Sequence, residues 1–150
     1  MSATLIAGLA RTAAPQTALR RFLALDALVT GANGLAYAAF SAPIGRLLGI
    51  GPATLFELGL FLTAYAAGVG WLASRRRPPV FGVKLVIEAN CVWVVLSLAS
   101  LFLWDAPTAA GLAWIPAQAL TVAGFALLQQ LSLRATATAT GRGTGASGPQ

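Results

Sequence analysis

Four polar side chains follow one another along an apolar stretch near the start of the chain: Asp26, Thr30, Asn33 and Tyr37. Their spacing places all of them on one face of an α-helix. The residues around them are apolar enough to enter a lipid bilayer, where a polar stripe must face protein or a water-filled cavity. The pattern therefore predicts a polar surface inside a helical membrane protein.

Three more polar side chains lie about as far along their apolar runs as Asn33 does: Tyr65, Asn90 and Gln118. At 1.5 Å per residue, each of the four lies about 15 Å from one end of its apolar run, so we expect them near the membrane midplane. Two interpretations stay open. The side chains either form hydrogen bonds between helices, worth about 0.6 kcal/mol each, or line a binding site for a small amphipathic molecule.

Lys84 and Glu88 lie four residues apart in another apolar run and, with Asp26, form a second layer about 6–12 Å from the ends that carry most basic residues. A charge at the centre of a membrane helix costs about 2.5–3.5 kcal/mol on insertion scales. We therefore expect the two carboxylates inside the bundle, with Lys84 within reach of one of them. The layer is either a structural ion cluster or a proton-exchanging site that uses Glu88 or Asp26.

The residue types that most enzymes and metal sites require are missing or isolated. The 150 residues include no histidine, and Cys91 is the only cysteine. This excludes an imidazole-bound metal, a bis-His haem site, a His-based catalytic triad and an intramolecular disulfide. Because no nucleophile and base lie together, we expect no catalytic residue, no metal, no cofactor and no enzymatic activity.

The elements that must position these residues are four apolar runs, each long enough to cross a hydrocarbon core of about 30 Å. The chain is 57% hydrophobic and only 9% charged, unlike a soluble domain. The predicted spans cover about 22–42, 54–74, 80–104 and 108–132, with proline and glycine in the turns between them. The expected fold class is all-α, a bundle of four transmembrane helices over residues 22–134.

The two flanks differ from this domain. Residues 1–21 lack the basic start of a secretory signal, and we expect a cytoplasmic segment that can lie on the membrane surface. Residues 135–150 are of low complexity and predict a disordered cytoplasmic tail.

The ten basic residues are distributed unevenly about the spans. Only Arg46 falls on one side; the other side has Arg11, Arg20, Arg21, Arg75, Arg76, Arg77, Lys84, Arg134 and Arg142. The positive-inside rule then predicts a multi-pass protein of the cell membrane with both termini in the cytoplasm. The same pattern accounts for the net charge of +6, so we expect the lipid bilayer and not nucleic acid as the partner. Arg75, Arg76 and Arg77 are expected to anchor the topology and contact lipid headgroups.

Parts of the sequence recur at similar spacing. Asn33 and Asn90 are the only asparagines, and each follows an alanine in an odd-numbered span, while Ala-Gly pairs recur in the other two spans. The recurrence indicates two copies of a helical hairpin in parallel orientation, although such matches also arise by chance in an alanine-rich chain.

The stretch from Leu25 to Tyr37, followed by Asn90-Cys91-Val92-Trp93 and later by Gln118 and Gln129, resembles small four-helix integral membrane proteins common in actinobacteria. The resemblance covers about residues 20–134 and implies the topology given above. That family carries no assigned activity and no catalytic motif, so the resemblance implies no chemistry.

Two functions remain open on the sequence. The first is a non-enzymatic inner-membrane protein, either a membrane subunit or a small-molecule-binding component, acting as a homodimer or with an unknown membrane partner. The second is a small proton-coupled transporter whose exchanging carboxylate is Glu88 or Asp26.

Overall fold

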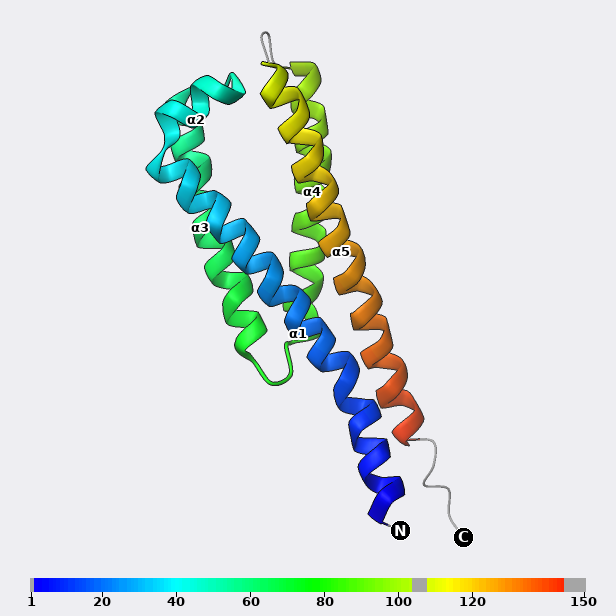
Figure 1. The fold of residues 1–150 in the computed structure, drawn as a ribbon. Helices are drawn as coiled ribbons and strands as arrows, with labels where there is room; N and C mark the ends of the chain where they lie inside the picture. Colours follow the sequence, from blue (N-terminus) through cyan, green and yellow to red (C-terminus); the bar gives the residue numbers. More distant parts are fainter. Residues whose placement is uncertain (1, 104–107, 145–150) are drawn as a thin grey trace.

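The part of the chain that the structure describes is almost entirely helical (Figure 1). The computed structural model describes residues 2–103 and 108–144, with backbone only for 2–13 and 142–144. Its helices are α1 (Ser2–Ala39), α2 (Ser41–Leu48), α3 (Pro52–Ser74), α4 (Val80–Leu103) and α5 (Ala109–Thr144). The all-α class predicted from the apolar runs is confirmed.

Four of these helices are long and apolar enough to cross a membrane, over Ala14–Ala39, Pro52–Ser74, Val80–Leu103 and Ala109–Gly141. Their outer faces carry large apolar side chains, and Phe102 and Leu120 are 89% and 74% exposed. Water would disfavour so much exposed apolar surface, whereas lipid accommodates it. The fold is therefore that of a multi-pass membrane protein, as the sequence predicts.

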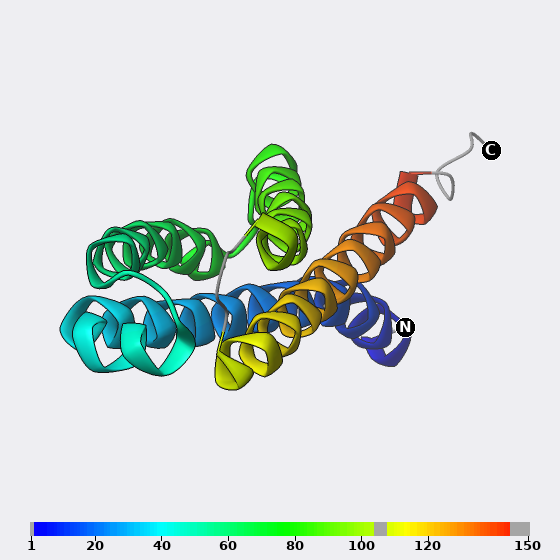
Figure 2. The ribbon, with the colours of Figure 1, turned by 90° about the horizontal axis from the view of Figure 1, so that it is seen from above.

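The four long helices form two antiparallel pairs. Helix α1 packs along α3, helix α4 packs along α5, and α1 also crosses α5. Helices α3 and α4 are consecutive in sequence, yet they barely touch. Figure 2, which looks along the bundle, shows α3 beside α1 and α4 standing apart from α3. The bundle consists of two hairpins joined mainly through α1 and α5.

Helices α1 and α3 meet backbone to backbone at two glycines. A Cβ atom on Gly59 would lie 2.5 Å from the Ala38 nitrogen and 2.7 Å from the Gly34 oxygen. No side chain fits there, so glycine is what allows the two helices to cross this closely. One turn further along α3, the Thr63 hydroxyl donates a hydrogen bond to the Gly59 carbonyl at 2.8 Å.

Helix α2 lies where the sequence predicts only a turn. It ends at Gly49, whose φ of 77° lies in the left-handed region that glycine adopts without strain. Leu48 and Ile50 then pack with Leu55 and Tyr37 in the core, because the apolar side of the short helix turns inward. The Thr108 hydroxyl donates to the Leu47 carbonyl and so fastens α2 to the start of α5.

The structure differs from the prediction at both ends of the chain. The predicted boundary at residue 21 does not coincide with a helix end, because α1 runs unbroken from Ser2 into the first span. Pro15 lies inside this helix and removes only one of its hydrogen bonds. Helix α5 continues to Thr144 instead of ending near 134. Its threonine hydroxyls donate to carbonyls of the preceding turn, as Thr138 does to Arg134, which keeps them satisfied within the helix. Residues 145–150 of the predicted tail, and 104–107, lie outside the described residues.

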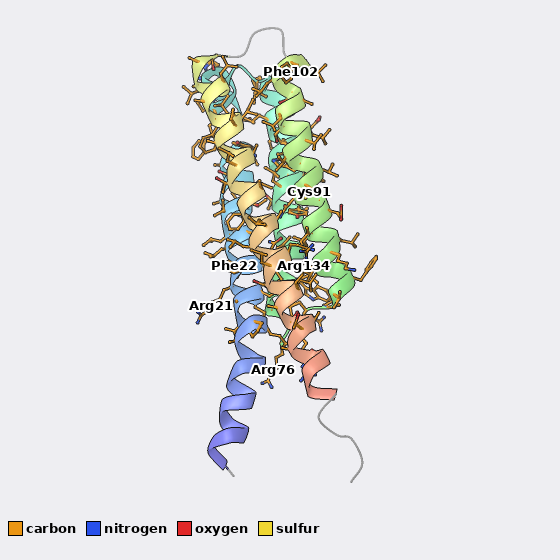
Figure 3. All side chains as sticks on the ribbon, turned by 90° about the vertical axis from the view of Figure 1, so that its right-hand side faces the viewer. Arg21, Phe22, Arg76, Cys91, Phe102 and Arg134 are labelled. Carbon is orange, nitrogen blue, oxygen red and sulfur yellow. The ribbon has the colours of Figure 1, made fainter. Side chains whose placement is uncertain are left out.

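The α3–α4 turn lies toward the same end of the bundle as the N-terminal part of α1 and the C-terminal part of α5 (Figure 1). These segments contain most of the basic residues. Arg21, Arg76 and Arg134 are labelled toward this end in Figure 3. The Arg20 Nε donates to the Ala73 carbonyl at 3.0 Å, so a cation meets the negative end of the α3 dipole. The Arg75 guanidinium lies 4.1 Å from the centre of the Trp71 ring. That this end faces the cytoplasm stays a prediction.

Candidate functional site

Asp26 is completely buried and accepts hydrogen bonds from three neutral side chains. The Thr30 hydroxyl donates to Oδ1 at 3.1 Å, while Asn90 Nδ2 and Gln129 Nε2 each donate to Oδ2 at 2.8 Å. The Tyr65 hydroxyl in turn donates to the Asn90 Oδ1 at 3.0 Å. These five residues, which we call the inner polar cluster, connect all four long helices.

A second group of polar side chains lies further along the stripe of α1. The Trp114 indole N–H donates to the Tyr37 hydroxyl at 2.6 Å, and that hydroxyl donates to Gln118 Oε1 at 2.9 Å. Tyr37 is 4% exposed, so its hydroxyl depends on these partners. This outer polar cluster connects α1 with α5 about 16 Å along α1 from Asp26.

A cavity of about 420 Å³ is lined by residues of all four long helices, including members of both clusters. The four side chains predicted for the midplane, Asn33, Tyr65, Asn90 and Gln118, all line it. Aromatic rings make up much of the remaining wall, namely Phe61, Trp93, Trp114 and Phe125 together with the Tyr65 ring. No lining residue is charged. The result is an apolar, aromatic cavity with a few amide groups.

The cavity opens to the surface of the bundle. Phe61 on α3 and Val92 and Leu96 on α4 line it, yet each is more than half exposed (59%, 55% and 60%). Because α3 and α4 barely touch, these side chains flank a lateral opening. A molecule dissolved in the bilayer could therefore enter between the two hairpins.

The side-chain amide of Asn33 has no hydrogen-bond partner among the described residues. Gln118 uses only its oxygen. Asn90, by contrast, has partners for both its oxygen and its nitrogen. Asn33 is only partly buried, so its unpaired amide is accessible from the cavity. The cavity thus offers two N–H donor groups and the Asn33 carbonyl to a molecule inside it.

The predicted layer of Asp26, Lys84 and Glu88 is corrected by the structure. Lys84 and Glu88 are both exposed on the outside of α4, and neither forms an ion pair within the described residues. Helix α4 turns Val83 and Asn90 inward, and helical geometry then leaves positions 84 and 88 on the outside. Asn90 and Gln129, not Lys84 and Glu88, are the partners of the buried carboxylate.

The depth of Asn90 also differs from the prediction. Asn90 bonds to Asp26, which precedes Asn33 by about 10 Å along α1, so the two asparagines are not level. The cause is that α1 begins well before residue 22, and its apolar stretch covers Ala14–Ala39, so counting from residue 22 does not locate the start of the span. Gln129 was not predicted as a site residue, although its helical spacing from Gln118 was the available signal.

The arrangement is suited to binding rather than to bond-making chemistry. Among the described residues, no group of three or more His, Cys, Asp or Glu side chains could hold a metal ion. The polar groups at the cavity are amides, hydroxyls and indoles, which orient a ligand by hydrogen bonds. The fold and cavity place the chain among small multi-pass membrane proteins. Comparisons with protein-family models, curated proteins and solved structures gave no match.

Proposed function

We propose that this protein is a non-enzymatic integral membrane protein of the cell membrane that binds a small, uncharged lipophile in the cavity between its hairpins. The observation that carries the proposal is the Asn33 amide, which has no partner among the described residues and lies in a mostly apolar wall. A ligand oxygen could accept hydrogen bonds from the Asn33 and Gln118 amides, and Asn33 could accept one in return.

The walls restrict the chemistry of the ligand. A volume of about 420 Å³ lies within the usual range for small-molecule sites. The lining holds no charged side chain, which favours a neutral molecule, because an ion would lose its hydration without a counter-charge in contact. The aromatic rings favour a planar ring system. A planar, carbonyl-bearing lipophile satisfies all three conditions.

The second candidate function is a proton-coupled transporter. The observation that favours it is the hydrogen bond between buried Asp26 and the cavity residue Asn90. Geometry favours the binding role, because neither carboxylate lines the cavity: Asp26 lies behind Asn90, and Glu88 is on the outside of α4. Transport requires pH-dependent uptake that is lost in Asp26→Asn or Glu88→Gln. The binding role, alone or as a membrane subunit, does not require such uptake.

Two further features belong to this proposal. Both termini lie in the cytoplasm, and the exposed Arg75, Arg76 and Arg77 contact anionic lipid headgroups there. The support is that these arginines belong to the α3–α4 turn, which lies toward the same end of the bundle as the N-terminal part of α1 and the C-terminal part of α5 (Figure 1). The resemblance to small actinobacterial membrane proteins is compatible with this topology.

The binding role is tested with 2-methyl-1,4-naphthoquinone, a neutral planar dicarbonyl, added to the protein in nanodiscs. Trp93 and Trp114 line the cavity, so their fluorescence should be quenched with saturation. Asn33→Leu should raise the apparent Kd at least about tenfold, equivalent to about 1.4 kcal/mol. The control is Ala32→Leu, since Ala32 is exposed and absent from the lining.

A second measurement covers a ligand of different structure. Native mass spectrometry of the protein released from its own membranes should detect a bound small molecule that is retained in Ala32→Leu and lost in Asn33→Leu. Linear, unsaturated quenching in every variant, together with no bound mass, would refute a binding cavity.

A further inference from the structure

Helix α4 is the least packed of the four long helices. It packs along α5 but barely touches α3. Its buried residues, Val83, Val86, Ile87 and Asn90, all lie in its first half. From 91 to 103 no residue of α4 is buried against the rest of the described chain. Much of its surface is therefore available to another partner.

A stripe of exposed side chains runs along this helix at alternating intervals of four and three residues: Lys84, Glu88, Cys91, Val95, Leu98 and Phe102. We call it the α4 stripe. It differs from the face packed on α5 and from the cavity face, which includes Ala89, Trp93 and Leu96. In Figure 3, Cys91 and Phe102 are labelled along α4. The alternating spacing is that of the seam between two helices in a left-handed coiled coil.

The two charges on the α4 stripe indicate what covers it. Glu88 lies about 12 Å from the start of α4, and neither it nor Lys84 has an ion-pair partner within the described residues. The long side chain of lysine can extend to the membrane interface, whereas the shorter side chain of glutamate reaches less far. Facing lipid is unfavourable for Glu88, because a charged side chain within the hydrocarbon loses its hydration. An opposite charge beside it would offset this.

A second copy of this chain supplies that charge. Two copies in one membrane share the same orientation, so their α4 helices would run parallel about a twofold axis along the membrane normal. Lys84 and Glu88 are one turn apart, about 6 Å, so each lysine could reach the glutamate of the other copy. Lys84 and Glu88 each lie level with their own counterpart across the seam, so the ion pairs are the crossed ones: the lysine of each copy reaches one turn along to the glutamate of the other, which gives two equivalent pairs.

We propose that the protein is a parallel homodimer whose interface is the α4 stripe. This inference does not depend on the proposed ligand, because the stripe and the cavity lie on different faces of α4. Cys91, the only cysteine, lies in the middle of the stripe and is exposed in the single chain. At a seam position of a parallel pair, a residue meets its own counterpart. The two Cys91 thiols of the dimer should therefore lie close enough to be linked.

The test begins with the unaltered protein in its own membranes, oxidised with copper phenanthroline. A dimer band that is reversed by reductant is expected. In a Cys91→Ala background, Val95→Cys should restore cross-linking, whereas Leu96→Cys and Leu120→Cys should not. These controls are matched, because Val95, Leu96 and Leu120 are 65%, 60% and 74% exposed. Equal cross-linking at all three positions would indicate random collision and overturn the interface.

Charge exchange provides a second test. Lys84→Glu and Glu88→Lys should each reduce the dimer fraction at least fivefold, because each single change places two like pairs across the seam. The double exchange, Lys84→Glu with Glu88→Lys, should restore it. A dimer fraction unchanged in both single variants, or a cross-linked product with a mass other than two chains, would also overturn the proposal.

Discussion

Asn90 on α4 donates a hydrogen bond from Nδ2 to the Oδ2 of Asp26 on α1, at 2.8 Å, although the two helices do not pack against each other. Their side chains bridge the space between the first hairpin and the second. Because Tyr65 on α3 also bonds to Asn90, the same amide connects three helices. The inner polar cluster therefore helps to set the separation of the hairpins, and with it the width of the cavity.

Removing the buried carboxylate should destabilise the bundle. Asp26→Ala leaves donors on Thr30, Asn90 and Gln129 without their acceptor, and buried unpaired groups cost about 1–3 kcal/mol. We expect the free energy of unfolding in detergent to fall by this amount. Glu57→Ala is the control, since Glu57 is exposed. Equal stability of the two variants would contradict the role assigned to the cluster.

The crossing of α1 and α3 should not tolerate one added methyl group. In Gly59→Ala the new Cβ would clash with backbone atoms of Ala38 and Gly34, so the two helices must separate. We expect a loss of about 1–3 kcal/mol, measured by denaturant unfolding followed by circular dichroism. Gly68→Ala on the same helix meets nothing within 4 Å and should be neutral or slightly stabilising. Similar losses in both variants would rule out the crossing as the cause.

The hydroxyl of Tyr37 should stabilise the packing of α1 on α5 through its hydrogen bonds with Trp114 and Gln118. Tyr37→Phe removes the acceptor of the indole N–H and the donor to the amide, so we expect stability to fall by about 1–2 kcal/mol. Trp114→Phe removes only the first bond. A double-mutant cycle should give a coupling energy of about 0.6–1.7 kcal/mol, the range found for hydrogen bonds between membrane helices. Strict additivity would mean that the bond between Tyr37 and Trp114 contributes nothing.

The orientation in the membrane can be measured with reporter fusions. A fusion after Arg77 should report the cytoplasm and one after Gly49 the outside, because the basic residues gather at the α3–α4 turn. Replacing Arg75, Arg76 and Arg77 together with glutamine should give mixed orientations, whereas Arg46→Gln should not. An external signal after Arg77 in the unaltered chain would invert the proposed topology.

The sequence alone determined the features that depend on composition and helical period. Apolar runs of about twenty residues require spanning helices, since only a helix satisfies its own backbone in lipid. The period of 3.6 residues placed Asp26, Thr30, Asn33 and Tyr37 on one face, and all four lie in the interior or at the cavity. These conclusions need no knowledge of which helices are neighbours.

Only the tertiary packing decided which face of each helix turns toward the interior, because the helical period does not determine this. The helical spacing places Lys84 and Glu88 on one face of α4 and Asn90 and Trp93 on another, but it does not say which face turns inward. The packing of α4 on α5 buries Asn90 and leaves Lys84 and Glu88 outside. The sequence also left the depth of the α1 side chains undetermined, because the helix runs unbroken from Ser2 to Ala39 and no helix end marks where the span begins. Only the packed bundle brings Gln129 to Asp26, since a contact between residues so distant in sequence depends on how every intervening helix is placed.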